Sequence, residues 1–215
     1  NKIDYNDPEK IKYRIERLES KNIIQGYNAI IDISKLGQTI YVVYLKLVLI
    51  SSKNEKEWID QIEKHPNVLA VGKNAGRWDM TIALKCENNQ IFDKILKEIT
   101  SSKSENIKEK LVTSEIESTY FAMNMIHKDM EKEISTSNNA DIEKIDKEDE
   151  TIIILLSQNC RMSLLDISEK VKMSPNGIKN KIKNLEKKKI IIGYKTKLNY
   201  EKIGFLHFRV FLHLS

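Results

Sequence analysis

Paired cysteines and long apolar runs are both scarce in this chain of 215 residues. The two cysteines, Cys86 and Cys160, lie far apart and fit neither a disulfide framework nor a metal-ligand motif. The longest apolar stretch, residues 39–50, is interrupted by Lys46 and is shorter than the roughly 20 residues that span a bilayer. We therefore expect a protein of a reducing compartment, the cytoplasm, with no membrane span and no signal peptide.

The motifs of common catalytic sites are also missing. We find no glycine-rich phosphate loop, no paired-carboxylate site, no Ser-His-Asp set and no metal-ligand spacing. Of the four histidines, His65 precedes a proline at an expected helix end and His127 lies in an expected linker, while His207 and His213 alternate with phenylalanines on an expected strand. The sequence therefore predicts no catalytic residue, no metal and no cofactor.

Positive charge is concentrated near the C-terminus. Residues 174–204 hold nine lysines against two glutamates, whereas residues 127–150 hold four lysines against nine acidic residues. A basic block beside an acidic one is typical of a polyanion-binding face next to a solvated linker. The alternative is a lysine-rich composition that happens to cover an exposed helix.

The chain repeats itself at an offset of 167 residues. Between residues 8–47 and 175–214, sixteen of forty aligned pairs are identical, without a gap. The shared residues include an isoleucine and leucine stripe, a Gly-Tyr pair and a later glycine. A repeat defines the unit of the fold, and this one is long enough to be a module of several domains. The chain thus reads as the tail of one module followed by the head of the next.

The second copy lies at the end of a predicted helix-turn-helix. A core stripe predicts a first helix from about residue 144 to 159, and Ser163 is a plausible N-cap for a short second helix. Ser174 is expected to cap a third helix with Pro175 at its first position. The apolar side of this third helix carries Ile178, Ile182 and Leu185.

The opposite side of the third helix carries lysine and asparagine, which suits a recognition helix. Asparagine can form two hydrogen bonds to an adenine edge, and lysine can reach guanine or phosphate. The β-prone segment after Lys189 would form a wing, with Lys195 and Lys197 near the DNA backbone. The alternative is a three-helix module that contacts only protein.

In the first copy, the same helix runs from Pro8 to Lys21, but only six residues precede Asp7, too few for the helices that should support it. An isolated helix of this length is marginally stable in water. We therefore expect the N-terminus to fall inside a domain.

The middle of the chain follows a β-α-β-β-α-β order. Expected strands cover residues 39–50, two segments on either side of 74–76, and 108–122, with amphipathic helices over 55–65 and 91–100. This order predicts a ferredoxin-like domain with four antiparallel strands, one face of which would be covered by self-association.

The whole arrangement resembles the Lrp/AsnC family of transcription regulators. The residues that carry the resemblance are "SPNGIKNKIKNLEKKKIIIGY", the "KLG" and "KIG" before the first strand, and "GRWD". The resemblance implies an α+β fold with five parts: a truncated winged helix-turn-helix (1–37), a ferredoxin-like effector and oligomerisation domain (38–123), a linker (124–144), a winged helix-turn-helix (145–204) and the first strand of a second ferredoxin-like domain (205–215).

The resemblance also implies partners and site residues. They are double-stranded DNA, further copies of the chain, and an amino-acid effector held near Gly76, Arg77, Trp78 and Asp79. A glycine turn exposes backbone N–H groups for a carboxylate, and Asp79 could meet an ammonium; the alternative is a structural turn. The residues predicted to contact DNA are Ser174, Asn176, Gly177, Lys179, Asn180, Lys181, Lys183 and Lys195, with Lys10, Tyr13, Arg14 and Arg17 in the first copy.

Two other functions stay open at this point. Siroheme decarboxylases resemble the same two-domain architecture, so an enzyme is one alternative. An amino-acid-binding module whose helix-turn-helix no longer binds DNA is the other.

Overall fold

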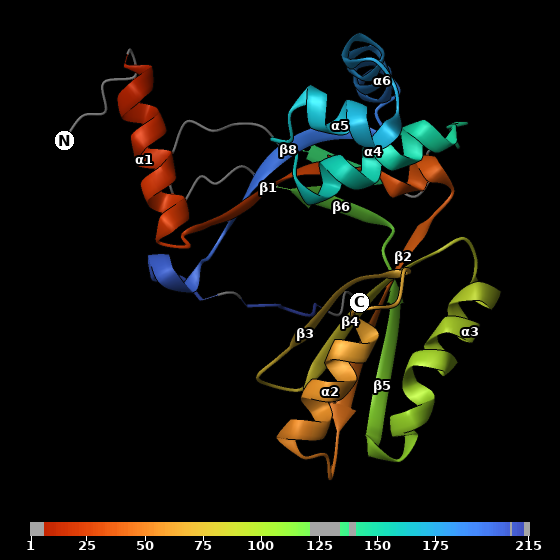
Figure 1. Cartoon of the computed structure of the whole chain (residues 1–215). Helices are drawn as coiled ribbons and strands as arrows, with labels where there is room; N and C mark the ends of the chain where they lie inside the picture. The colour runs from red at the N-terminus through yellow and green to blue at the C-terminus, as the bar shows by residue number, and fades with distance from the viewer. Residues whose placement is uncertain (1–6, 121–133, 138–140, 207, 213–215) are drawn as a thin grey trace. The chain divides into compact units, whose positions relative to one another are not determined.

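The computed structural model of the chain describes residues 7–120, 134–137, 141–206 and 208–212 (Figure 1). It divides into two compact units. Residues 1–31 and 145–215 form one, here called the repeat unit, and residues 32–144 form the other, the sheet unit. Both copies of the repeat therefore contribute to one unit. No helix within the described ranges is long and apolar enough to cross a membrane.

The sheet unit contains the expected four-stranded antiparallel sheet, in the order β3-β4-β2-β5. This order and the two helices confirm the ferredoxin-like prediction. The elements are β2 (Thr39–Leu47), α2 (Ser52–Ile62), β3 (Val68–Lys73), β4 (Met80–Cys86), α3 (Asn89–Thr100) and β5 (Ile107–Ser114), with short 3₁₀ helices at Ile33–Leu36 and Ser101–Asn106.

The core of the sheet unit lies between one face of the sheet and the two helices. Alternate residues of β2 and β4 point to that face, among them Val43, Leu45 and Ile82, all fully buried. Trp58 of α2 is 1% exposed, and its Nε1–H donates to the carbonyl of Ile99 in α3 at 2.8 Å. Both helices therefore pack on the same face.

The expected last strand, 108–122, is in fact two strands. β5 pairs with β2 as far as Ser114, opposite Tyr41 and close to the start of β2. Beyond Ser114 the pairing with β2 ends. The next strand, β6 (Glu117–Tyr120), pairs with β7 (Ile134–Ser137) instead. β7 falls inside the expected linker 124–144, so that segment contains a strand. Residues 121–133 and 138–140, which include most of the linker, lie outside the described residues.

The repeat unit contains the expected three helices of a helix-turn-helix. They are α4 (Lys147–Gln158), α5 (Leu164–Val171) and α6 (Pro175–Lys187), and each begins after a capping side chain. Ser163 and Ser174 are two of these caps, as predicted. Lys172 forms the turn between α5 and α6 with a φ of 57°. Ile152, Ile167 and Ile178, one from each helix, are completely buried.

The expected wing is not a hairpin belonging to one helix-turn-helix. Strand β8 (Ile191–Leu198) instead pairs antiparallel with β1 (Ile24–Ile31) of the first copy. Because a lone strand cannot satisfy its backbone N–H and C=O groups, the two single wing strands complete one another. Figure 1 shows this two-stranded ribbon beside α4.

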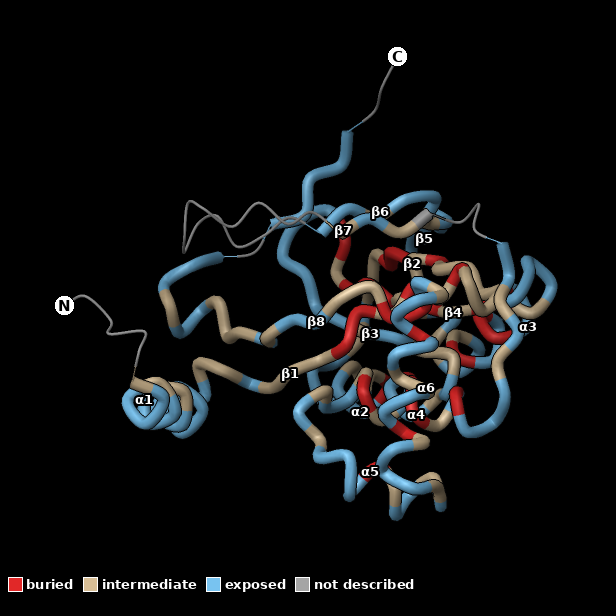
Figure 2. The backbone as a smooth tube through the Cα atoms, turned by 90° about the horizontal axis from the view of Figure 1, so that it is seen from above, coloured by how far each residue is buried: buried red, intermediate tan, exposed pale blue. Residues whose placement is uncertain are grey.

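Two segments of the repeats differ in packing from their equivalents in the other copy. They are helix α1, equivalent to α6, and residues 205–212, equivalent to part of β2. Helix α1 (Pro8–Ser20) has no buried residue and is drawn exposed or intermediate throughout in Figure 2. Beyond a 3₁₀ turn at Glu201–Ile203, the described residues of 205–212 form no strand, contrary to prediction. Their equivalent, β2, is a strand that pairs with β4 and β5, and no described strand pairs with residues 205–212.

Candidate nucleic-acid interface

Helix α6 is fixed by its cap and by its apolar side. The Ser174 hydroxyl accepts a hydrogen bond from the Gly177 N–H at 3.2 Å, and Pro175 occupies the first turn, where it removes no helical hydrogen bond. Ile178 and Leu185 are fully buried against the rest of the three-helix core, and Ile182 is partly buried. The remaining side of α6 is therefore held in one orientation toward solvent.

That solvent-facing side carries four of the eight residues predicted to contact DNA in the second copy, together with Asn184. Asn176, Lys179, Asn180, Lys183 and Asn184 are all exposed. They combine amides that can pair with base edges and ammonium groups that can pair with phosphates or guanine. The structure thus leaves this face of α6 available to a partner.

Gly177 has a packing explanation that the sequence did not reveal. A Cβ at this position would lie 2.8 Å from Cγ of Met173 and 3.3 Å from the capping Oγ of Ser174. The glycine therefore lets the turn between α5 and α6 close tightly. Contact of its backbone with DNA is not needed to explain why a glycine stands there.

Lys181 does not belong to the exposed face. Its Nζ lies 2.6 and 2.8 Å from the two carboxylate oxygens of Asp146 and 3.0 Å from Oδ1 of Asp149, at the N-terminus of α4. Only 20% of its side chain is exposed, and that of Asp149 is 9% exposed. We therefore correct the prediction for Lys181: it clamps α6 to α4. No local pattern could indicate this pairing, because the two carboxylates lie 32 and 35 residues away in the sequence.

This clamp makes the stability of the repeat unit depend on pH. The hydrogen bond from Lys181, followed by that from the Asp149 N–H, lowers the pKa of Asp146 to about 2 from 3.8. A lowered folded-state pKa contributes stability above the unfolded value, and this stability is lost as the pH falls from about 4 toward about 2. Asp146 is exposed, so solvent screening limits the size of the effect.

Replacing Lys181 with methionine should destabilise the protein without removing a DNA contact. It leaves the largely buried Asp149 carboxylate without its cation, which should lower the free energy of unfolding by about 1–3 kcal/mol. The acid transition of Asp146 should also move to higher pH. The measurement is urea unfolding at neutral pH and near pH 3.

The control is Lys179→Met, an exposed lysine on the same helix, which should change stability by less than about 0.5 kcal/mol. Equal losses for the two variants would contradict the role given to Lys181.

In the first copy, the residues predicted to contact DNA are also exposed. Tyr13 is 65% exposed, and Arg14 and Arg17 lie on the outer side of α1. Lys10 is exposed but forms an ion pair with the capping residue Asp7 at 3.0 Å. The Asp7 carboxylate in turn accepts from the Lys10 N–H at 3.1 Å.

Helix α1 is attached to the rest of the repeat unit by a polar cluster. The Tyr27 hydroxyl donates to Oε1 of Glu19 at 2.6 Å, and the Arg161 guanidinium lies 3.4 Å from the same oxygen and 4.6 Å from the centre of the Tyr27 ring. The second copy repeats the first of these contacts, because Tyr194 donates to Glu186 at 2.6 Å. No sequence pattern indicates a role for Arg161, although the Glu and the Tyr recur in both copies of the repeat.

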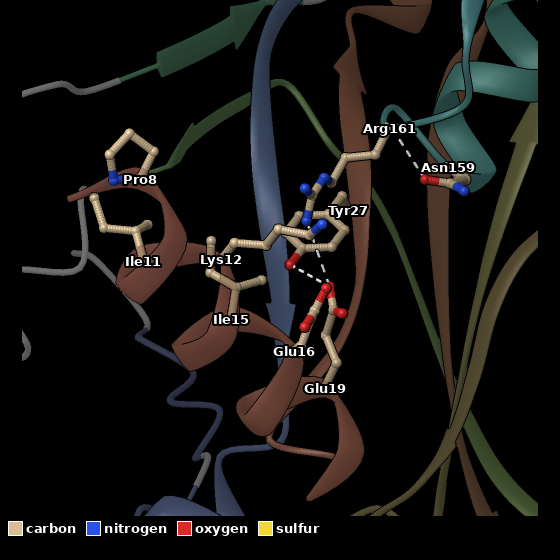
Figure 3. A pocket seen from close by; sticks show the side chains of 9 residues that line it. All are labelled: Pro8, Ile11, Lys12, Ile15, Glu16, Glu19, Tyr27, Asn159 and Arg161. Atoms are coloured by element: carbon tan, nitrogen blue, oxygen red, sulfur yellow. Dashed lines mark hydrogen bonds and ion pairs between the residues drawn. The ribbon is translucent and has the colours of Figure 1, made fainter.

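A cavity of about 750 Å³ lies beside this cluster, under the apolar side of α1 (Figure 3). Ile11 and Ile15 of α1 line one side, and Asn159 and Arg161 of the α4–α5 turn line the other. In the second copy, the equivalent isoleucines, Ile178 and Ile182, pack into the three-helix core instead. The cavity therefore lies on the side of α1 that corresponds to the side of α6 covered by α4 and α5.

Lys195 and Lys197 lie on the ribbon, not at a wing tip. Both are exposed, and Lys195 stands directly opposite Asn28 of β1. The Asn28 amide donates to the carbonyls of Ser157 and Gln158 at 2.6 and 3.2 Å, so it caps the C-terminus of α4. The ribbon is thereby joined to the helix-turn-helix.

The predicted effector residues lie between β3 and β4. Gly76 has a φ of 140°, Trp78 is buried beside Tyr44, and the exposed Arg77 guanidinium lies 5.3 Å from the centre of the Trp78 ring. The Asp79 carboxylate accepts from Nζ of Lys46 at 2.9 Å and from the Leu47 N–H at 2.7 Å.

Asp79 is thus already paired. Burial raises its pKa, but the hydrogen bonds from the Leu47 N–H and from Lys46 outweigh that effect, and the pKa lies below its usual value. The carboxylate acts as a link between β4 and β2, which favours the structural interpretation of this residue over contact with an ammonium.

A three-helix core with an exposed third helix and a β-strand after it defines a winged helix-turn-helix, and the comparisons agree. A winged helix-turn-helix DNA-binding family matches residues 145–192. The chain is 31% identical over 108 residues to an uncharacterised HTH-type transcriptional regulator of Pyrococcus furiosus, covering 50% of this chain and 70% of that protein. It is 34% identical over 61 residues to the HTH-type transcriptional regulator LrpA of Pyrococcus horikoshii, covering 28% of this chain and 43% of LrpA.

The chain therefore belongs to the Lrp/AsnC family of HTH-type transcription regulators. It spans less than half the length of LrpA. Among solved structures, the siroheme decarboxylase NirDL matches with a TM-score of 0.56 at 12% identity, over 89% of this chain and 56% of that one. At this identity the likeness shows the fold alone. Because it covers 89% of this chain, the matched region includes parts of both copies of the repeat.

Proposed function

We propose that this chain is a sequence-specific DNA-binding transcription regulator that places α6 in the major groove. The observation that carries the proposal is the exposed face of α6, on which Asn176, Asn180 and Asn184 alternate with Lys179 and Lys183. Helix α6 follows α5 through a tight turn and is held by a buried apolar side, as a recognition helix requires.

Each kind of side chain on that face has a role in this function. The asparagine amides can read adenine, while Lys179 and Lys183 can pair with phosphates or guanine. Lys195 and Lys197 on β8 would add backbone contacts. The partner is double-stranded DNA, and we accordingly place the protein in the cytoplasm.

The test is selection of bound duplexes from a random pool, followed by titration of the enriched duplex at several salt concentrations. We expect an enriched sequence, and we expect the logarithm of the affinity to fall linearly with the logarithm of the salt concentration. Absence of any enriched sequence together with salt-independent binding would contradict the proposal.

We further propose that the sheet unit mediates self-association and responds to an amino acid. Both helices of this unit cover one face of the sheet, and the other face carries the partly exposed Ile40, Val42 and Leu111. Arg77, Trp78 and the Gly76 turn are the candidates for the effector site; an exposed guanidinium stacked on an indole suits a carboxylate.

An effector should raise the melting temperature, because a ligand that binds only the folded state stabilises it. At a concentration near 100 times its Kd, the gain is about 2.7 kcal/mol. The measurement is a thermal-shift screen of the twenty amino acids, in which Arg77→Ala should abolish any positive response. A response that survives Arg77→Ala would place the effector elsewhere.

The second candidate function is an enzyme acting on a tetrapyrrole. It is favoured by the likeness to NirDL, whose structure is also known with an iron-uroporphyrin III analogue. Of the four histidines, only His65 lies in the described part of the chain. Its Nδ1 accepts a hydrogen bond from the Asn67 N–H at 3.2 Å, so this nitrogen already has a partner. Titration with iron-uroporphyrin separates the two functions: we expect no change in the porphyrin spectrum.

A further inference from the structure

The two-stranded ribbon relates the two copies of the repeat by a local two-fold axis. In the register of β1 and β8, Asn28 pairs with Lys195, and these are equivalent residues at the 167-residue offset. The pairs on either side are related in the same way: Tyr27 pairs with Thr196, and their equivalents, Tyr194 and Ala29, pair with one another. The register shifts next to Gly26 and Gly193 skip Gln25 and Ile192, which are also equivalent. The axis therefore passes through the Asn28–Lys195 pair.

The helices before the two strands are also held in equivalent ways. Glu19 of α1 and Glu186 of α6 each accept from the tyrosine eight residues later, both at 2.6 Å. The equivalent residues Asn22 and Lys189, which follow the two helices, have φ values of 53° and 55°. One chain thus presents α1 and α6 in the arrangement that a symmetric dimer would give to two copies of one recognition helix.

The outer faces of these two helices differ in chemistry. At equivalent positions α1 has Tyr13 and Arg17 where α6 has Asn180 and Asn184. All four side chains are exposed. Arginine favours guanine through two hydrogen bonds to O6 and N7, whereas asparagine favours adenine through N6 and N7.

The two helices also differ in charge. Helix α1 holds four basic residues against three acidic ones, while α6, apart from Lys181 with its pairing to Asp146 and Asp149, holds three basic residues against one. Phosphate contacts supply sequence-independent affinity, so α6 should contribute more of it than α1.

From this geometry we propose that a single chain engages one duplex through both helices, and that its operator is a pseudo-palindrome with unequal halves. The half under α1 contains a guanine read by Arg17, and the half under α6 contains an adenine read by Asn184. The inference rests on the proposed DNA-binding function and goes beyond it in stoichiometry and in operator sequence.

The test compares the full chain with Arg17→Ala and Asn184→Ala in selections from a random pool. These two residues are a matched pair, because they occupy equivalent positions and each uses its backbone carbonyl to accept the N–H four residues later. Both side chains are exposed, so neither variant should unfold the protein, and circular dichroism checks this. The stoichiometry of the complex is measured on the enriched duplex by analytical ultracentrifugation.

We expect the full chain to select an asymmetric operator at one chain per duplex. Arg17→Ala should reduce the preference for a guanine in one half by about 10-fold, and Asn184→Ala should reduce the preference for an adenine in the other half by a similar factor. The unchanged half of each operator serves as the internal control.

A symmetric operator, or an operator unchanged by Arg17→Ala, would overturn the inference while DNA binding through α6 still stood. Loss of preference in the same half for both variants would overturn it as well. Failure of the unmodified chain to enrich any sequence would remove both the inference and the proposed function.

Discussion

Reversing the charge of Lys179 and Lys183 together is expected to lower DNA affinity by at least about 100-fold near 0.1 M salt. Both lysines are exposed on the outer side of α6, one turn apart. The double variant replaces two ammonium groups by carboxylates that repel the phosphates. The slope of log affinity against log salt should also become shallower by about 2.

The matched control changes the net charge equally in the other unit of the chain. Lys56→Glu with Lys94→Glu alters two exposed lysines on α2 and α3 of the sheet unit. Fluorescence anisotropy with one selected duplex at several salt concentrations gives all three affinities. If the control loses as much affinity as the α6 variant, the effect is one of net charge, and α6 is not the recognition helix.

Replacing Trp58 with alanine is expected to give the largest loss of stability in the sheet unit, about 3–5 kcal/mol. The side chain is 1% exposed within the core, so its removal leaves a large cavity. It also removes the donor to the Ile99 carbonyl, which connects α2 to α3. Because domains are stabilised by only about 5–15 kcal/mol, this change should shift the urea midpoint strongly.

Trp58→Phe separates the two contributions. It keeps most of the aromatic volume but leaves the Ile99 carbonyl without the indole donor, and we expect a smaller loss of about 1–3 kcal/mol. Urea unfolding followed by far-ultraviolet circular dichroism measures both variants. A loss below about 1 kcal/mol for Trp58→Ala would show that this core can collapse around the missing ring.

Local patterns in the sequence were sufficient to predict the helices of the helix-turn-helix and the elements over 39–114, but not strands β6 and β7. The order of strands and helices over 39–114 follows from periodicity, and the caps Ser163 and Ser174 mark the starts of α5 and α6. These features depend on residues a few positions apart, which is the range over which helix capping and amphipathic periodicity act.

Contacts between distant residues could not be predicted in the same way. Lys181 donates hydrogen bonds to Asp146 and Asp149, and Lys46 donates one to Asp79. Both interactions depend on tertiary packing. The pairing of β1 with β8 joins residues that lie 160 or more positions apart in the sequence. The repeat did contain a signal for this pairing, since two equivalent unpaired wing strands can satisfy one another, but the sequence alone did not fix the register.

The central pair of the ribbon has a consequence for assembly between chains. If β8 paired in the same register with β8 of another molecule, Lys195 would face a second Lys195, and like charges directly opposite on neighbouring strands are destabilising. In the present ribbon Lys195 faces the neutral Asn28. Two different residues therefore meet at the axis when both copies belong to one polypeptide, and pairing of β8 with β8 between molecules is disfavoured.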